Sequence, residues 1–283
     1  MIICIVGPTG VGKTKLSEHL AKKYDAIVVN ADAMQVYREL DIGTAKVKPS
    51  EMLASEHYLF DIKKPDEDYS VYDYQKDIRN ILDKNKNKNI VVVGGTGLYI
   101  KAGLFNYEFS EREKRSFDEY TNEELYKMLE SRNDLNEIHI NNRKRMVSRL
   151  NSSGNNNLKD ELLYDTIFIG LTIDREVLYE RINDRVDNMM NEGLLQEVKE
   201  LYSKYGKVKS LTTGIGYKEI IEYLDGNIRY DEAIDLIKAR SRKYAKRQYT
   251  WFNNQMDVKW FNTNYENFDK TIKDVEVYID SLN

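Results

Sequence analysis

Near the start of the chain is a run with the residue types and spacing of a phosphate-binding P-loop, Gly7-Pro8-Thr9-Gly10-Val11-Gly12-Lys13-Thr14. Its glycines allow backbone N–H groups to curl around phosphate oxygens, and the N-terminus of the following helix adds partial positive charge. Lys13 supplies a mobile cation, and the Thr14 hydroxyl is a candidate ligand for Mg²⁺ as cofactor. The run therefore predicts a phosphate site. Proteins with such a site usually hydrolyse ATP or GTP or transfer a phosphoryl group to a small molecule.

The acidic residue expected near this site is placed differently from that of nucleotide hydrolases. In hydrolases an acidic Mg²⁺ ligand ends an apolar strand, but here the apolar residues 90–93 run into Gly94-Gly95-Thr96-Gly97. An acid instead follows the apolar residues 26–29, in the run Asn30-Ala31-Asp32. Ligands of open α/β sheets bind at the carboxyl ends of the strands, so Asp32 is expected to lie beside the phosphates.

The elements that must position these residues are visible as apolar runs. Residues 2–6, 26–29, 90–93 and 166–172 are apolar and β-branched, which predicts buried parallel strands. Residues 15–24, between the first two runs, carry apolar side chains at helical spacing. The chain thus begins as a βαβ unit. We predict an α/β fold with a P-loop NTPase-like core, in which helices flank a parallel sheet.

The rest of the chain is predicted to be mainly helical. Residues 106–138 are charged and lack a strand pattern, so we expect them to form a small helical insertion between core segments 1–105 and 139–283. Residues 151–157 have the composition of a polar loop. From residue 175 the pattern is helical almost to the end, including residues 175–204, 216–224 and 231–252.

Composition and charge indicate a globular protein. The apolar content is 41%, there are three prolines, and the single cysteine, Cys4, excludes an internal disulfide and favours a reducing compartment. The opening apolar run is too short for a signal peptide, and no later stretch approaches about 18 apolar residues, so we expect a cytoplasmic protein without membrane association. The net charge of −4 argues mildly against nucleic acid, but residues 238–247 contain cations and no acid, which suits RNA.

Further runs, taken together with the P-loop, resemble those of the tRNA dimethylallyltransferases. They are Asp32-Ala33-Met34-Gln35-Val36-Tyr37, residues 40–46, residues 93–99, residues 138–149, residues 181–198, Gly214-Ile215-Gly216-Tyr217 and residues 245–251. The resemblance spans nearly the whole chain, although the insertion is shorter than is usual in that family and Ala33 replaces a common serine. So many runs in one order make a chance match very unlikely.

The resemblance implies a prenyl transfer. The diphosphate of dimethylallyl diphosphate would occupy the P-loop, where Lys13, Thr14 and Mg²⁺ would stabilise the departing pyrophosphate. Asp32 would accept a proton from the exocyclic amine of adenine as that nitrogen attacks the allylic carbon. The resemblance implies that the phosphates or the reacting adenine are held by Thr9, Thr96 and Arg185. Arg181 is the alternative to Arg185.

The resemblance also implies a tRNA substrate whose reacting adenine lies immediately 3′ of the anticodon. Because the amine of a stacked, paired adenine is inaccessible, the base must be splayed out of a single-stranded loop. The family positions that contact the RNA correspond here to Asp32, Ala33, Met34, Gln35, Thr96, Arg143, Arg145, Arg149, Gly216, Tyr217 and Lys218. The insertion is expected to contact the anticodon stem, and the chain is expected to be a monomer.

Other interpretations of the same residues remain open. Asp32 could cap a helix or orient water on Mg²⁺, and Arg185 could belong to a solvated helix face. The arginines of residues 143–149 could form an ordinary charged face. Two rival functions share the P-loop and Asp32: prenylation of a free adenine nucleotide, and phosphotransfer or nucleotide binding. A third, RNA binding without chemistry, would leave the P-loop unexplained.

Overall fold

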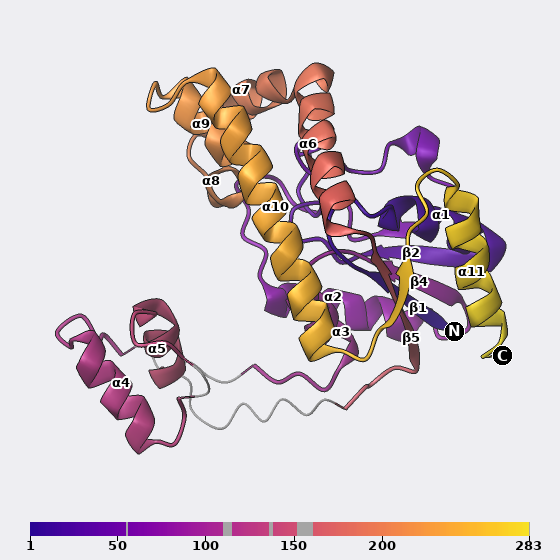
Figure 1. Cartoon of the computed structure of the whole chain (residues 1–283). Helices are drawn as coiled ribbons and strands as arrows, with labels where there is room; N and C mark the ends of the chain where they lie inside the picture. The colour runs from indigo at the N-terminus through magenta and orange to yellow at the C-terminus, as the bar shows by residue number, and fades with distance from the viewer. Residues whose placement is uncertain (55, 110–114, 136–137, 152–160, 283) are drawn as a thin grey trace. The chain divides into compact units, whose positions relative to one another are not determined.

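The computed structural model describes residues 1–54, 56–109, 115–135, 138–151 and 161–282. The chain forms two compact units, of which the first comprises Met1–Phe105 and Leu162–Asn283 and the second comprises Asn106–Glu161 (Figure 1). Within the described residues, no helix is both long enough and apolar enough to cross a membrane.

The first unit is built on a parallel sheet. In the described residues it has six strands in the order β3-β2-β4-β1-β5-β6, and every neighbouring pair is parallel. The strands are β1 (Ile2–Val6), β2 (Ala26–Asn30), β3 (His57–Tyr58), β4 (Asn89–Val93), β5 (Thr166–Thr172) and β6 (Lys259–Asn262). The four predicted strands are confirmed, and so is the predicted fold class. The two edge strands, β3 and β6, were not predicted.

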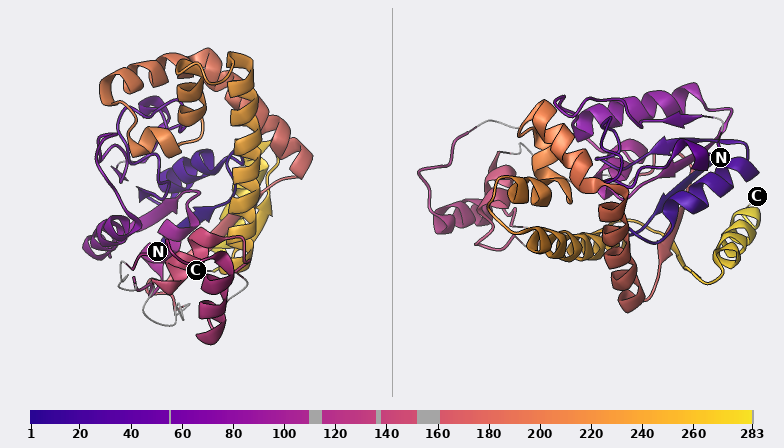
Figure 2. Two further views of the ribbon diagram at one scale, coloured as in Figure 1. Left: turned by 90° about the vertical axis from the view of Figure 1, so that its left-hand side faces the viewer. Right: turned by 90° about the horizontal axis from the view of Figure 1, so that it is seen from above.

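Helices cover both faces of this sheet (Figures 1 and 2). Because side chains alternate along a strand, Cys4 and Val6 of β1 join one buried cluster, whereas Ile3 and Ile5 join the other. The helices of the first unit are α1 (Lys13–Lys23), α2 (Val71–Lys84), α3 (Gly97–Leu104), α6 (Arg175–Glu192), α7 (Leu194–Tyr205), α8 (Lys209–Thr213), α9 (Tyr217–Leu224), α10 (Tyr230–Gln255) and α11 (Phe268–Asp280). Helices α1 and α11 pack on the Ile3 face, and α2, α3, α7 and α9 pack on the Cys4 face.

The helical region after residue 175 differs from the prediction at two places. The predicted helix 175–204 is broken at Gly193, which has a φ of 105° and caps α6. The left-handed conformation suits glycine and ends the helix, so α7 begins in a new direction. Residues 259–262 form strand β6 and not a helix, because they pair with the edge of β5. Helices α6 and α10 lie side by side (Figures 1 and 2).

The second unit extends beyond residue 138, where the sequence analysis predicted that the core would resume. It contains α4 (Asn122–Ser131) and α5 (Arg143–Leu150). Met146 and Leu150 of α5 are buried with Leu125 and Leu129 of α4 in a small separate core. This packing assigns α5 to the insertion. Of the predicted polar loop at residues 151–157, all but the first residue lie outside the described residues.

Gly94 provides a test of the packing at the end of β4. A Cβ atom at this position would lie 2.2 Å from the backbone carbonyl of Ala31, which directly follows the neighbouring strand β2. Because backbone atoms cannot move aside cheaply, we predict that Gly94→Ala lowers the free energy of unfolding by about 3 kcal/mol. Urea denaturation measures the change.

The matched control for Gly94→Ala is Gly226→Ala. Gly226 has a φ of 76° and no heavy atom within 4 Å of an added Cβ. The free energy of unfolding of Gly226→Ala should therefore fall by only about 1 kcal/mol, which is the cost of the left-handed conformation for alanine. Equal losses in the two variants would contradict the close approach at Gly94.

Candidate active site

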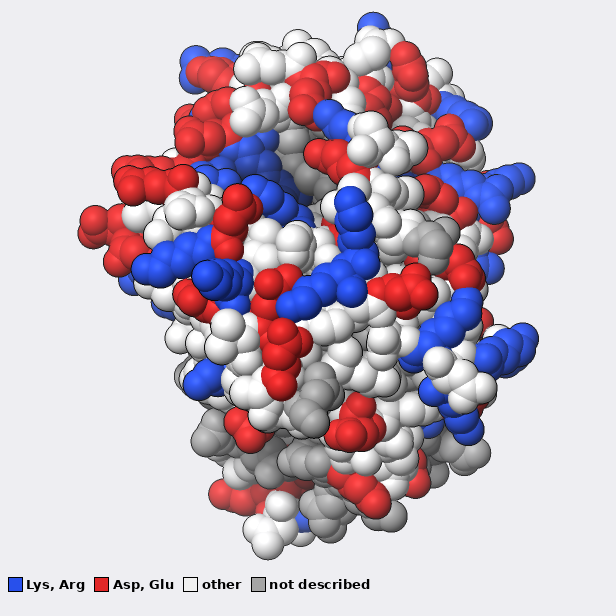
Figure 3. Space-filling view, turned by 90° about the vertical axis from the view of Figure 1, so that its right-hand side faces the viewer, with Lys and Arg blue, Asp and Glu red and all other residues white. Residues whose placement is uncertain are grey.

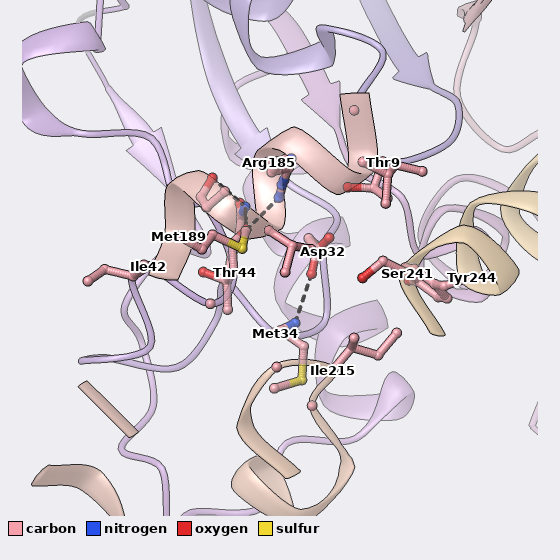
Figure 4. Close-up of a pocket in the computed structure, with 18 of the residues that line it drawn as sticks. Thr9, Asp32, Met34, Ile42, Thr44, Arg185, Met189, Ile215, Ser241 and Tyr244 are labelled. Carbon is pink, nitrogen blue, oxygen red and sulfur yellow. Dashed lines mark hydrogen bonds between the residues drawn. The ribbon is translucent and has the colours of Figure 1, made fainter. Parts of the chain in front are cut away.

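A cavity of about 940 Å³ lies in the first unit, beside the P-loop. Figure 4 shows Thr9, Asp32, Arg185 and Tyr244 around it, each from a different segment of the chain. The cavity therefore gathers the P-loop, the segment after β2, and helices α6 and α10. On the face drawn in Figure 3, Lys and Arg side chains gather beside a hollow. The predicted site residues that line the cavity are Thr9, Gly10, Gly12, Lys13, Thr14, Asp32, Met34, Gln35, Arg181, Arg185, Gly216, Tyr217 and Lys218.

The P-loop connects β1 to α1, as predicted. Lys13 is the first residue of α1, and its Nζ donates hydrogen bonds to the carbonyl oxygens of Gly7 at 3.0 Å and Pro8 at 2.8 Å. Burial lowers the pKa of Lys13 to about 8, although the charge of Asp32 opposes this shift and that of Arg185 adds to it. The lysine is thus folded along the loop, in electrostatic contact with the predicted base.

Asp32 is held in one orientation by its own backbone surroundings. Its N–H donates to Asn30 Oδ1 at 2.8 Å, and its Oδ1 accepts from the N–H of Met34 at 2.9 Å. The N–H of Ala33 donates to Thr96 Oγ1 at 3.1 Å, so the segment after β2 is joined to the end of β4. One carboxylate oxygen therefore closes a turn over residues 32–34. Residues 33–48, all of which the structure describes, contain no helix, so the helix-cap interpretation of Asp32 is wrong. In the described part of the chain, Oδ2 has no hydrogen-bond donor.

The two candidate arginines of α6 have different surroundings. Arg185 is half-buried and its Nη2 donates to the carbonyl oxygen of Thr44 at 3.4 Å. Burial lowers its pKa, and the charge of Asp32 opposes this shift. Arg181 is exposed, and its guanidinium stacks 3.3 Å from the ring centroid of Tyr265 next to the P-loop. Of the two arginines, Arg185 is thus the more buried and interacts electrostatically with Asp32. Its predicted contact with the phosphates or the adenine stays a prediction.

Residues 42–45 line the cavity wall, and residues 41–43 are held by Glu197, which was not predicted as a site residue. Glu197 Oε2 accepts hydrogen bonds from the N–H groups of Asp41 at 3.2 Å and Ile42 at 2.8 Å. Its Oε1 accepts from the N–H of Gly43 at 3.1 Å and from the hydroxyl of Tyr217 at 2.7 Å. The side chain of Tyr217 is fully buried. Tyr217 is therefore a buried part of this wall, held by Glu197.

Gln248 of α10 was also not predicted. The N–H of Thr9 donates to Gln248 Oε1 at 2.9 Å, and Gln248 Nε2 donates to the carbonyl oxygen of Gly95 at 3.0 Å. Next to it, Tyr244 is in hydrogen-bonding contact with Thr96 and Gln248. Burial raises the pKa of the Tyr244 hydroxyl, and the charge of Asp32 adds to this shift. Helix α10 thus joins the P-loop to the end of β4.

The predicted RNA-binding arginines lie in the second unit and differ from one another. Arg143 donates to the carbonyl oxygens of Tyr120 and Phe117, both at 2.7 Å. Arg149 donates from Nε to Asp134 Oδ1 at 2.7 Å. These two arginines therefore stabilise the unit itself. Arg145 is exposed on α5.

In the basic segment of α10, several cations have partners within the first unit. Lys238 pairs with Asp187 at 2.7 Å, Arg240 pairs with Glu219, and Arg242 donates to Asn183 Oδ1 at 2.5 Å. Lys243, Lys246 and Arg247 are exposed. The part of this segment available to a polyanion is thus its C-terminal half.

Fold and site together define a P-loop α/β protein with a carboxylate after its second strand. A family model for IPP transferase matches residues 35–255. The tRNA dimethylallyltransferase of Bacillus licheniformis is 42% identical over 98% of this chain and 96% of the relative. That of Geobacillus thermodenitrificans is also 42% identical, over 98% and 96%.

Solved structures agree with this match. The crystal structure of the full-length tRNA isopentenylpyrophosphate transferase from Bacillus halodurans is 40% identical, with a TM-score of 0.77 over 99% of this chain and 95% of that one. A eukaryotic dimethylallyltransferase solved in snapshots of its action on tRNA is 27% identical, with a TM-score of 0.84 over 99% of this chain and 78% of that one. The chain belongs to the IPP transferase family and is a prenyltransferase.

The lowered pKa of Lys13 predicts a pH dependence of phosphate binding. Below about pH 8 the free protein carries a charged Lys13, and a bound polyphosphate raises the pKa of Lys13 again. Binding should therefore take up a proton near pH 8.5, and affinity for pyrophosphate should fall by up to about tenfold per pH unit above pH 8. Calorimetry in buffers of different ionisation enthalpy measures the proton uptake.

The matched control for this pH dependence is Lys13→Arg, which keeps its charge throughout the range. Titration of pyrophosphate itself is common to both proteins, so only the difference between their pH profiles reports on Lys13. Identical profiles would contradict the lowered pKa.

Proposed function

We propose that this protein transfers a dimethylallyl group from dimethylallyl diphosphate to the exocyclic amine of the adenine 3′ of the anticodon in tRNA, releasing pyrophosphate. The observation that carries the proposal is that the Lys13 ammonium and the Asp32 carboxylate lie in one cavity and interact electrostatically. A phosphate-binding cation and a proton acceptor are the two groups that such a transfer needs. The names of the relatives support the same substrates.

In the proposed reaction the adenine nitrogen attacks the allylic carbon that carries the diphosphate. The carbon–oxygen bond breaks and its electron pair leaves with pyrophosphate, whose growing charge is stabilised by Lys13 and the P-loop N–H groups. The attacking nitrogen loses its proton to Asp32 Oδ2. Arg185, which interacts electrostatically with Asp32, would offset the negative charge that the carboxylate and the leaving group share.

The residues of the site suit Mg²⁺ as cofactor. Mg²⁺ is usually bound through one or two protein oxygens together with substrate phosphates and water, and the Thr14 side chain lines the cavity. In the described residues no group of three His, Cys, Asp or Glu side chains forms a metal site. Substrate phosphates and water would supply the other ligands of an Mg²⁺ held by Thr14. When bound, Mg²⁺ would neutralise charge on the departing pyrophosphate.

An RNA substrate fits the size of the cavity and the chemistry of its rim. A volume of about 940 Å³ accommodates a flipped base as well as a diphosphate. Met34, Gln35 and Lys218 line this cavity, and exposed Lys243 and Arg247 follow on α10. We also propose that the second unit contacts the anticodon stem through Arg145, and that the enzyme is a cytoplasmic monomer.

The direct test incubates the protein and Mg²⁺ with radiolabelled dimethylallyl diphosphate. Unmodified anticodon stem-loop RNA is offered in one tube and AMP in another. We expect label in the RNA alone. Label in AMP alone would replace the proposal with nucleotide prenylation, and label in neither would remove both.

Asp32→Asn tests the proposed base. Asparagine keeps an oxygen that can accept the Met34 N–H bond, so the turn is preserved, but it cannot take up the amine proton. We expect turnover to fall by about a hundredfold, with no rise in KM for the diphosphate. Steady-state kinetics with stem-loop RNA separate kcat from KM. Turnover within threefold of the wild type would remove Asp32 from the mechanism.

Arg145→Ala and Arg143→Ala separate RNA contact from support of the second unit. Arg145 is exposed, so its loss should raise KM for RNA by about fivefold, equivalent to about 1 kcal/mol, with unchanged stability. Arg143→Ala leaves two carbonyl oxygens of residues 117 and 120 without this donor, so limited proteolysis of residues 106–161 should accelerate. An Arg145→Ala enzyme with unchanged KM for RNA would remove Arg145 from the contact surface.

A further inference from the structure

Gln248 forms a buried bridge between the P-loop and the residues that follow β4. Its side chain is 5% exposed, and its two amide atoms are both engaged, Oε1 by the N–H of Thr9 and Nε2 by the carbonyl oxygen of Gly95. A Cβ atom on Gly95 would lie 2.1 Å from Nε2, so only glycine admits the amide at this place. The amide is therefore fixed from both sides and cannot rotate without losing hydrogen bonds.

The bridge lies at one particular end of the phosphate site. In P-loops the backbone N–H groups cradle the inner phosphates, whereas the lysine reaches the outer ones. Lys13 Nζ contacts the carbonyl oxygens of Gly7 and Pro8. A phosphate reached by this ammonium would therefore lie beside the first residues of the loop. The N–H of Thr9 is the next donor along the chain, and Gln248 already occupies it.

This geometry bears on how many phosphates the loop can accept. A third phosphate, extending outward past the lysine, would need the space and the N–H donor that the Gln248 amide takes. The displaced amide would leave two buried polar partners without hydrogen bonds. A diphosphate that ends at Lys13 avoids this cost.

We propose that Gln248 is a specificity-determining residue that limits this P-loop to two phosphates and excludes nucleoside triphosphates. The proposal rests on the proposed function for the identity of the diphosphate donor. It explains how a motif shared with nucleotide hydrolases can serve an allylic diphosphate in a cell rich in ATP.

The test measures binding of inorganic pyrophosphate and tripolyphosphate with Mg²⁺ by calorimetry, on the whole chain and without RNA. The wild-type protein should bind pyrophosphate more tightly by about tenfold or more. In Gln248→Ala the preference should shrink to within about threefold, chiefly through tighter binding of tripolyphosphate. An equal change in both affinities, or an unchanged preference, would make Gln248 a structural link only and overturn the proposal.

Two further variants supply a second test and a control. Gln248→Met keeps the length and volume of the side chain but removes both hydrogen bonds, so it tests the donor competition if Gln248→Ala is unstable. The preference of Gln248→Met for pyrophosphate over tripolyphosphate should also shrink. Gln255→Ala changes an exposed glutamine of the same helix and should keep the wild-type preference.

The transferase assay separates this proposal from the proposed function. A wild-type protein that transfers the prenyl group but binds both polyphosphates equally would overturn the role of Gln248 alone. A wild-type protein that binds neither polyphosphate would overturn both, because the P-loop would then not be the donor site.

Discussion

The site depends on one electrostatic constraint, which is that Lys13 must stay available to phosphate inside a cavity that destabilises its charge. Burial lowers its pKa, and the Asp32 carboxylate opposes the shift. Asp32 thus stabilises the cation before a ligand arrives, and a diphosphate would replace it as the main counter-charge. Placing the carboxylate after β2 brings it near the lysine without making it part of the P-loop, because both strands end at the same edge of the sheet.

The C-terminal half of the chain fixes the geometry that this balance requires. Glu197 of α7 collects three backbone N–H groups from residues 41–43. Gln248 of α10 joins Thr9 to Gly95. Both side chains satisfy backbone groups of loops that would otherwise be free to move. The helices after β5 therefore position the loops of the N-terminal βαβ unit, and they also bring Arg185 to Asp32.

The sequence was sufficient to predict the parts of the structure that depend on local pattern. The strands β1, β2, β4 and β5 have neighbours on both sides, so they are continuous apolar runs, and the P-loop motif specifies its own context. Strand β3 has only two residues and β6 has exposed ends, so neither carries a clear pattern. Glu197 and Gln248 were not predicted because they bond to backbone groups far away in the sequence. The N–H groups that Glu197 binds are 154 to 156 residues away, and the N–H group that Gln248 binds is 239 residues away. No periodicity encodes such pairs.

The position of the carboxylate also differs from that of the acidic Mg²⁺ ligand in nucleotide hydrolases. An acid at the end of β4 would be placed to bind Mg²⁺ beside the phosphates, but Gly94 and Gly95 occupy that position and allow close approach of Ala31 and of Gln248. The space is filled by backbone and by an amide that carries no charge. Asp32 follows the neighbouring strand β2, has its Oδ1 fixed by Met34, and lines the same cavity as the P-loop. In the proposed reaction the phosphates would form the leaving group, and the nucleophile would lose its proton to a carboxylate that need not bind the phosphates.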